Sequence, residues 1–386
     1  MKTTSYLSGF VLKLFEKNGL RASKPLITML TTLTVCLLGG AEANLVSLAE
    51  ALPYDRTSLL VRMQRIRRFL SNERISPLKT LIPLIRLMRP ILSELDEIVL
   101  SVDRTEWKRL CKVVNILTVA LSYKGRAIPL FWIVLDRKGN TSFEHWIQVL
   151  APVIEVLNQM NWISAPIHAV ADREFATPKL AEWLKTTYGV DSTLRLKASM
   201  YLSGDGMPET KISELLKGMR KGDRTVLYNQ TVTRDSKFEM NVLLTWGTDY
   251  EEPLVVMTTS GDPERADSVY GLRFGIEPMH KDWKSNGFEI EKSRITDPKC
   301  IETMLILIAF AYVLCVFEGE RAEKEGVVQK PPKGKKRVVG LFLSGLRAFR
   351  RQVRQATTMQ LKKFILRLIK PFCDAWDWKI SVAGYG

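Results

Sequence analysis

The stretch Ile98-Val99-Leu100-Ser101-Val102 is a short apolar run that ends at the acidic residue Asp103. A run of this length and composition predicts a strand buried inside a sheet. A second run of the same kind, Ile167–Ala171, ends at another acid, Asp172. The sequence therefore predicts two buried strands, each with a carboxylate at its end.

The segments around these two strands alternate between strand and helix patterns. A turn at residues 123–126 is expected to join two β-rich runs into a hairpin. The predicted strands are 98–102, 112–121, 127–135, 167–171 and 193–197, and the predicted helices are 143–157 and 178–188. The order β-β-β-α-β-α-β, with acids at the ends of the first and fourth strands, predicts an α/β fold of the RNase H-like type.

Four regions differ in pattern along the chain. The third of them has strand-like runs at 225–232, 238–246 and 254–259, with glycines and charges between them. We therefore divide the chain into an N-terminal helical domain (1–96), an RNase H-like catalytic domain (97–199 and 268–318), a β-rich insertion (200–267) and a basic helical C-terminal tail (319–386).

Two short predicted helices in the N-terminal region are separated by the breaker Pro53-Tyr54-Asp55. The first covers residues 44–52, and the second covers 56–70 with an apolar stripe at helical spacing. The stripe consists of Leu59, Met63, Ile66 and Leu70, and the residues outside it include Arg62, Arg65, Arg67 and Arg68. The pattern resembles a helix-turn-helix, in which Arg62 and Arg65 would contact DNA. The alternative is a helical bundle with a solvated basic face.

The chain of 386 residues carries 57 Lys+Arg against 41 Asp+Glu, which gives a formal net charge of +16. Such a surplus favours a polyanionic partner, nucleic acid first, over a basic protein without such a role. Between Gly319 and Lys370, 15 Lys+Arg stand against 3 acids, a net of +12. Most of the surplus therefore lies in the C-terminal region, where it can bind phosphates without reading sequence.

The five cysteines are isolated from one another, and the three histidines are far apart in the sequence. We therefore expect no disulfide framework and no zinc finger, and any metal would have to be held by carboxylates. The apolar stretches 26–38 and 304–317 are shorter than the roughly 20 residues that a membrane-spanning helix needs. With no signal-peptide pattern at the N-terminus, the sequence predicts a cytoplasmic protein without a membrane partner.

The most informative stretch is Tyr270-Gly-Leu-Arg-Phe-Gly-Ile-Glu-Pro-Met-His-Lys-Asp-Trp-Lys284, which predicts a helix over residues 267–285. At about 100° of rotation per residue, its polar residues share an arc of about 80°. These are Tyr270, Arg273, Glu277, Lys281 and Lys284, and the residues opposite are Leu272, Ile276, Met279 and Trp283. This face presents a single carboxylate among cationic side chains and a phenol. Such a face is suited to binding a metal ion and a phosphate next to each other. The alternative is a surface helix with an i,i+4 pair between Glu277 and Lys281. Pro278 should kink this helix or mark a turn.

A spacing of Tyr-x2-Arg-x3-Glu-x6-Lys resembles the YREK signature of the IS4-type DDE transposases, and here it is formed by Tyr270, Arg273, Glu277 and Lys284. Asp103, in Val-Asp-Arg-Thr-Glu-Trp, resembles the first catalytic Asp of that family. Asp172, in Ala-Asp-Arg-Glu-Phe, resembles the second. The β-rich insertion before Glu277 also resembles the family's architecture, so the resemblance extends over about residues 44–297.

The resemblance implies a DNA transposase that cuts at insertion-sequence ends and joins them to target DNA by a cut-and-paste pathway. Asp103, Asp172 and Glu277 would be catalytic and would hold two Mg²⁺ or Mn²⁺ ions, which prefer oxygen ligands. Tyr270, Arg273 and Lys284 would contact phosphates near the scissile bond, and the helix arc adds Lys281. The expected partners are double-stranded DNA, as terminal inverted repeats and target, and a second copy of the chain in a synaptic complex. The expected location is the prokaryotic cytoplasm, at the nucleoid.

One position departs from the family pattern. Relatives often carry, directly after a Glu-Pro pair in the insertion, a Trp that stacks on a base flipped out of the DNA, but here Leu254 follows Glu252-Pro253. Trp246 on the neighbouring predicted strand is a candidate substitute, with a packed core Trp as the alternative.

Two other functions stay open: an RNase H-like metal-dependent nuclease without strand transfer, and an inactive or domesticated transposase that acts as a DNA-binding protein.

Overall fold

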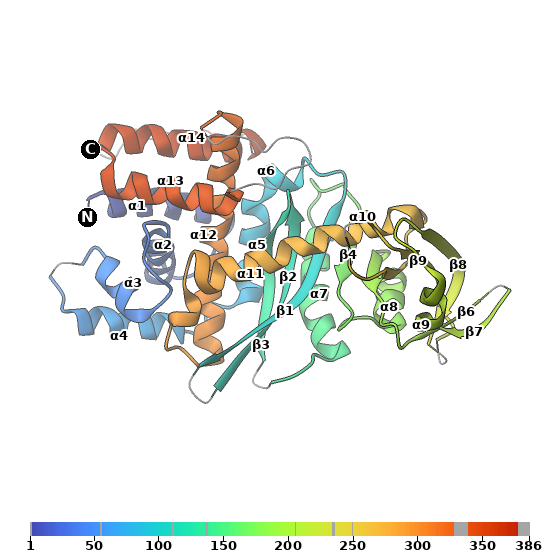
Figure 1. The fold of residues 1–386 in the computed structure, drawn as a ribbon. Helices are drawn as coiled ribbons and strands as arrows, with labels where there is room; N and C mark the ends of the chain where they lie inside the picture. Colours follow the sequence, from blue (N-terminus) through green and yellow to red (C-terminus); the bar gives the residue numbers. More distant parts are fainter. Residues whose placement is uncertain are drawn as a thin grey trace.

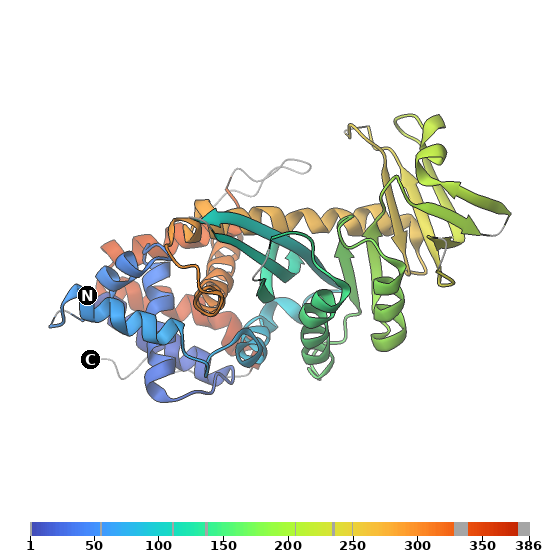
Figure 2. The same cartoon turned by 90° about the horizontal axis from the view of Figure 1, so that it is seen from below.

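The computed structural model describes residues 2–54, 56–109, 112–135, 138–204, 206–233, 236–248, 250–327 and 339–376. Helices gather at one end of the molecule, and the sheet extends from the middle to the other end (Figure 1). Figure 2, turned by 90°, shows the same division. The first and the last described helices both belong to the helical end.

The helices described before the first strand pack on one another and on a long central helix, α12 (Pro298–Lys324). They are α1 (Lys2–Lys17), α2 (Lys24–Leu38), α3 (Leu45–Ala51), α4 (Leu59–Leu70), α5 (Pro77–Leu87) and α6 (Arg89–Leu92). Side-chain oxygens of Asn44, Ser58 and Ser76 cap the first turns of α3, α4 and α5. The apolar stripe predicted for α4 is confirmed, because all of its members are buried or half-buried against the core.

The first half of the sheet consists of β1 (Ile98–Arg109), β2 (Lys112–Tyr123), β3 (Arg126–Leu135), β4 (Ile167–Ala171) and β5 (Asp191–Arg195). β1 pairs antiparallel with β2 and parallel with β4, and β4 pairs parallel with β5. Helices α7 (Phe143–Asn158) and α8 (Pro178–Tyr188) lie between the later strands in the chain. The predicted order of strands and helices is confirmed, with β5 starting two residues earlier than expected.

β1 is longer than the sequence predicted, since it continues through Asp103 to Arg109. Its parallel pairing with β4 ends at Val102 and Ala171, whereas its antiparallel pairing with β2 continues beyond that point. With one neighbouring strand instead of two, this second part of β1 is not buried on both sides. It therefore lacks the apolar run by which the first part was recognised.

The strands of region 200–267 continue the same sheet, whose full order is β3-β2-β1-β4-β5-β10-β9-β8-β6-β7. They are β6 (Tyr201–Gly204), β7 (Met207–Lys211), β8 (Arg224–Val232), β9 (Glu239–Thr245) and β10 (Leu254–Thr258), with the short helices α9 (Ile212–Leu215) and η1 (Leu216–Gly218). β10 pairs antiparallel with β5, through Val256 and Arg195 among others. Backbone hydrogen bonds thus join this region directly to the strands that carry the acids.

A long helical run crosses the sheet on the face opposite α7 and α8 (Figure 2). It consists of α10 (Ala266–Gly271), the 3₁₀ segment η3 (Leu272–Gly275), α11 (Ile276–Lys281) and the π segment η4 (Asp282–Asn286), with η2 (Pro263–Arg265) before it and η5 (Ile290–Lys292) after it. The predicted helix over 267–285 is confirmed in extent. Along this run the helix type changes three times, from α to 3₁₀, back to α and then to π, whereas the predicted arc assumed a uniform α-helix.

Helix α12 is the central element of the helical end and is longer than the predicted apolar stretch. Its 27 residues are long and apolar enough to cross a membrane, and no other helix in the described ranges meets that test. However, 89% of its most apolar window is buried inside the fold, against α2, α5, β3 and α13 among others. The burial is that of a core helix.

The C-terminal region is not a free tail in the structure. Helices α13 (Leu341–Gln355) and α14 (Thr358–Trp376) bury apolar residues against the core, and the ring of Phe342 stacks on Tyr312 of α12 at 4.4 Å between centroids. The basic run 330–337 lies outside the described residues. Removing residues 319–386 would therefore uncover part of the core in addition to removing positive charge.

The close contact between α12 and α13 depends on glycines. A Cβ at Gly345 would overlap the backbone carbonyl of Cys315, and a Cβ at Gly319 would overlap that of Leu341. We expect Gly345→Ala to lower the free energy of unfolding by about 1–3 kcal/mol, as overpacking does, although Ala is the better helix former. Urea denaturation measures this, with Gly218→Ala as the control, because nothing lies within 4 Å of its added Cβ. A Gly345→Ala variant as stable as wild type would contradict the packing.

Candidate active site

The two strand-end acids lie side by side because of the register between β1 and β4. Val102 pairs with Ala171 in the last step of this parallel ladder, so the next residues, Asp103 and Asp172, follow at the same level of the sheet. Neighbouring strands are about 4.8 Å apart. Two carboxylates are thereby held close together at the point where the two strands separate.

The helical run that crosses the sheet brings the signature residues to these acids. The hydroxyl of Tyr270 donates a hydrogen bond of 3.0 Å to Oδ1 of Asp172. Nη1 of Arg273 lies 3.8 Å from Oδ2 of Asp103, and its Nη2 donates to Oε1 of Glu277 at 3.0 Å. The guanidinium of Arg273 therefore links a β1 carboxylate to a carboxylate of α11.

The predicted arc of five equivalent polar residues is only partly realised. Tyr270 and Arg273 are buried, whereas the side chain of Glu277 is 57% exposed. Leu272, assigned to the core face, is instead 43% exposed. The 3₁₀ segment η3 explains this difference, since it turns about 120° per residue instead of 100°. The rest of the core face, Ile276, Met279 and Trp283, is buried as predicted.

Pro278 does not interrupt the helical run. It is the third residue of α11, which begins directly after the 3₁₀ segment. The first N–H groups of a helix have no hydrogen-bond partner within that helix. The absence of an N–H group in proline therefore removes no helical hydrogen bond at this position.

The two lysines after Glu277 point in different directions. Nζ of Lys284 donates to the carbonyl of Glu106 on β1 at 2.9 Å and lies 3.5 Å from the carboxylate of Glu291. Lys281 is exposed and has no ion pair in the ranges that the structure describes. Lys284 therefore ties the end of the helical run to β1, and Lys281 presents its charge to solvent.

The local environment shifts the pKa values of the two aspartates in opposite directions. Burial raises the pKa of Asp103 to about 6, against the opposing effects of the hydrogen bond from the backbone N–H of Arg104 and of the charge of Arg273. Burial also raises the pKa of Asp172, but the backbone N–H of Arg173 and the charge of Arg273 outweigh it, so that this pKa lies below its ordinary value. Of the two carboxyl groups, that of Asp103 is therefore the harder to ionise.

Two residues near the acids were missed by the sequence reasoning. His280 is buried, with Nδ1 4.0 Å from Oδ2 of Asp103, and burial lowers its pKa to about 3, so the ring is neutral. Arg195 at the end of β5 places Nη1 3.9 Å from Oδ1 of Asp172. The sequence placed Arg195 in the middle of the predicted strand 193–197, so it gave no signal that this residue ends a strand beside Asp172. His280 falls between the two faces of the predicted helix, so the pattern assigned it to neither.

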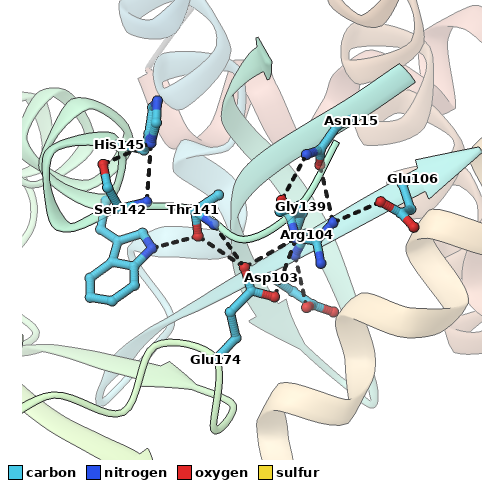
Figure 3. A network of polar contacts seen from close by, with 10 residues as sticks. Asp103, Arg104, Glu106, Asn115, Gly139, Thr141, Ser142, His145 and Glu174 are labelled. Carbon is cyan, nitrogen blue, oxygen red and sulfur yellow. Dashed lines mark hydrogen bonds and ion pairs between the residues drawn. The ribbon is translucent and has the colours of Figure 1, made fainter. Parts of the chain in front are cut away.

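A polar network connects the segments next to the two acids (Figure 3). Nε of Arg104, the residue after Asp103, donates to both oxygens of Glu174 at 3.1 and 3.2 Å. The same carboxylate accepts hydrogen bonds from the backbone N–H and the hydroxyl of Thr141, just before α7. This pair therefore connects β1, the loop after β4 and the loop before α7.

A cavity of about 380 Å³ opens beside the site between β9, β10 and the helical run. Its lining includes Arg195, Tyr250, Leu254, Tyr270 and Phe274. The candidate stacking residue Trp246 is not among the lining residues, and its indole N–H donates to the carbonyl of Tyr250. The aromatic rings that line this cavity therefore come from Tyr250, Tyr270 and Phe274.

The side chains that could hold a metal ion at this site are carboxylates. No three His, Cys, Asp or Glu side chains within the described ranges converge closely enough to form a metal cage as they stand. Glu277 is turned towards Arg273, whereas Asp103 and Asp172 are adjacent. Hard oxygen donors and the raised pKa of Asp103 both suit a divalent cation such as Mg²⁺.

The candidate DNA-binding arginines lie at the helical end, on α4. Arg65 is exposed, with its guanidinium 5.5 Å from the centroid of the Tyr54 ring. Arg62 is half-buried, and its Nε has no hydrogen-bond partner among the described residues. Neither arginine contacts the acids, so the two groups of predicted site residues lie in separate parts of the molecule.

Residues 126–314 match the family model of the transposase DDE domain. The match supports a DDE transposase, and such a domain implies an RNase H-like fold. It includes Asp172 and the whole helical run with Tyr270, Arg273 and Glu277, and it begins after Asp103. No curated protein matches the chain significantly.

The opposite pKa shifts of the two aspartates give opposite dependences of stability on pH. Since the folded-state pKa of Asp103 is raised to about 6, its contribution to stability is present below about pH 4 and is lost as the pH rises through 6. We expect Asp103→Asn, in EDTA, to be more stable than wild type by about 1–3 kcal/mol at pH 8 and equally stable at pH 4.

Asp172→Asn is the matched control, because the pKa of Asp172 is lowered. In the wild-type protein, the ionised carboxylate of Asp172 stabilises the fold above about pH 4, and this stabilisation is lost as the pH falls. The Asp172→Asn variant should therefore be less stable than wild type at pH 8. Thermal denaturation across this pH range measures both differences. Identical pH profiles for the two variants would contradict the electrostatic description.

Proposed function

We propose that the protein is a DNA transposase of the IS4 type, which cleaves DNA at insertion-sequence ends and joins those ends to target DNA by a cut-and-paste pathway. The observation that carries the proposal is the parallel register that puts Asp103 beside Asp172, with Arg273 and Tyr270 linking both to the helical run of Glu277. The match to the transposase DDE domain supports the same class of reaction.

Asp103, Asp172 and Glu277 would hold Mg²⁺ or Mn²⁺, with two ions expected. Such ions, when bound, activate an attacking oxygen and stabilise a leaving oxygen at phosphorus. The adjacency of Asp103 and Asp172 and the exposed carboxylate of Glu277 support this assignment. Glu277 is the ligand with most freedom to turn, because only Arg273 bonds its carboxylate among the described residues.

The other residues of the site would bind and orient the DNA. Tyr270 holds Asp172 through its hydroxyl, and Arg273 offsets the charge of the carboxylates until a phosphate or a cation arrives. Lys281 and Lys284 lie further along the same run, where they would contact backbone phosphates of a bound strand. Arg62 and Arg65 would contact DNA at a separate site on the helical end.

The cavity beside Asp172 would accept an unstacked base. Aromatic rings and an arginine form suitable stacking platforms for any base, and Tyr250, Phe274 and Arg195 supply them. This role passes from Trp246 to Tyr250 and Phe274, since Trp246 does not line the cavity.

A nuclease without strand transfer and an inactive DNA-binding transposase stay as alternatives. A homodimer would be needed to pair two DNA ends.

The test is cleavage of a plasmid that carries the DNA flanking the coding sequence, with Mg²⁺ or with EDTA. We expect Mg²⁺-dependent cuts at the two ends and joined products with added target plasmid. Asp103→Ala, Asp172→Ala and Glu277→Ala should each lower the cleavage rate by more than about 100-fold, since even residues that only support metal ligands contribute ten- to hundred-fold.

Glu182→Ala is the control for loss of an acid, because Glu182 is exposed on α8, away from the site. It should cleave as wild type does. Undiminished cleavage by Glu277→Ala would contradict the site, and cutting without joined products would favour the nuclease. Binding without cutting by the wild-type protein would favour the inactive transposase.

A further inference from the structure

Arg126, the first residue of β3, contacts the helical run on both sides of Glu277. Its backbone packs against Gly275, which precedes Glu277 in the 3₁₀ segment η3. Its side chain forms an ion pair with Asp282, which follows Glu277 at the start of the π segment η4. One residue of the sheet therefore holds both ends of the segment that carries Glu277.

The backbone contact leaves no room for a side chain on the helical run. A Cβ at Gly275 would lie 2.6 Å from both the carbonyl carbon and the carbonyl oxygen of Arg126. Close to this contact, the hydroxyl of Ser122 on β2 donates to the carbonyl of Leu272 at 3.2 Å. The segment η3 thus lies directly on the backbone of the β2–β3 hairpin, and a methyl group at position 275 would force the two apart.

The side-chain contact is buried. Nη1 of Arg126 donates to Oδ2 of Asp282 at 3.0 Å, and only 1% of the Asp282 side chain is exposed. The hydroxyl of Tyr312 on α12 donates to the same oxygen at 3.1 Å. No second cation forms an ion pair with Asp282 within the described ranges. Because an unpaired buried charge is costly, this pair opposes any movement of Asp282 away from β3.

Glu277 depends on these contacts because its own side chain is weakly held. Its carboxylate is 57% exposed and bonds Arg273. The backbone is helical from Gly275 to Asp282, so a displacement at either contact moves Glu277 as well. A misplacement of about 1 Å can slow an enzymatic reaction by about 100-fold.

We propose that Arg126 is a positioning residue for Glu277. Its carbonyl sets the distance between the helical run and β3, and its guanidinium fixes the run along the strand. The side chain of Glu277 can then turn from Arg273 towards Asp103 and Asp172 without any movement of the backbone. The inference rests on the proposed function for the metal ion that these acids would share.

Gly275→Ala tests the backbone contact in the full-length protein. Titration with Mn²⁺, followed by electron paramagnetic resonance, measures metal affinity without DNA. We expect this variant to bind Mn²⁺ about ten- to hundred-fold more weakly than wild type, as happens when a residue that supports a metal ligand is lost. At saturating DNA, its Mg²⁺-dependent cleavage should be about 100-fold slower. Its affinity for DNA in EDTA should be unchanged, because many phosphate contacts share that affinity.

Two alanine variants serve as controls. Gly218→Ala controls for the added methyl group, because Gly218 also ends a 3₁₀ segment and nothing lies within 4 Å of its added Cβ. Gly345→Ala controls for lost stability, because it overpacks the contact between α12 and α13 instead. Both should bind Mn²⁺ and cleave DNA as wild type does, at a temperature at which all variants are folded. A Gly275→Ala variant that behaves like these controls would overturn the inference.

A double-mutant cycle tests the ion pair. Arg126→Gln and Asp282→Asn should each slow cleavage, and the double variant should lose no more than the slower single variant, since both changes break the same contact. The double variant leaves no buried charge unpaired, so it stays informative where a single change unfolds the chain. Cleavage by the double variant at the wild-type rate, or losses that add, would contradict a positioning role for the pair.

Failure of this inference is distinguishable from failure of the proposed function. If wild type and Gly275→Ala bind Mn²⁺ and cleave DNA equally well, the transposase function stands and the positioning role fails. If Gly275→Ala and Glu277→Ala both weaken Mn²⁺ binding but wild type never cleaves DNA, the positioning role stands and the function fails. A wild-type protein that binds no Mn²⁺ would contradict both.

Discussion

The burial of carboxylates at the ends of two neighbouring strands is the constraint on which the arrangement of the candidate site depends. Register between β1 and β4 forces Asp103 and Asp172 together, and burial makes their charges more costly. Arg273, itself buried, supplies the nearest opposing charge and at the same time bonds Glu277. The helical run that carries Arg273 crosses the sheet at this place and leads through η5 into α12, whose glycine-mediated packing with α13 stabilises the helical end.

The sequence was sufficient for those features that depend on local patterns. Apolar runs ending in acids located β1 and β4, and the four-residue spacing located the helix that carries Glu277. The helical periodicity of apolar residues also predicted the stripe of α4 that the structure packs against the core. Each of these signals lies within about 20 consecutive residues, so no knowledge of distant contacts was needed.

Features that depend on distant contacts could not be predicted. The exposure of Leu272 follows from a 3₁₀ segment that the chain adopts while crossing the sheet, and pattern analysis assumes uniform rotation. The pairing of β10 with β5 and the burial of α13 and α14 join segments far apart in sequence. His280 reaches Asp103 only through the tertiary fold, and a lone histidine carries no spacing signal.

The central claim is that Asp103 and Asp172 form the metal-binding centre of a phosphoryl-transfer enzyme. Anomalous diffraction at the manganese edge, from crystals soaked in Mn²⁺, tests it most directly. We expect an anomalous peak between the carboxylates of Asp103 and Asp172, with Glu277 turned away from Arg273 towards the ion. A bound manganese elsewhere, with none at these two carboxylates, would contradict this account.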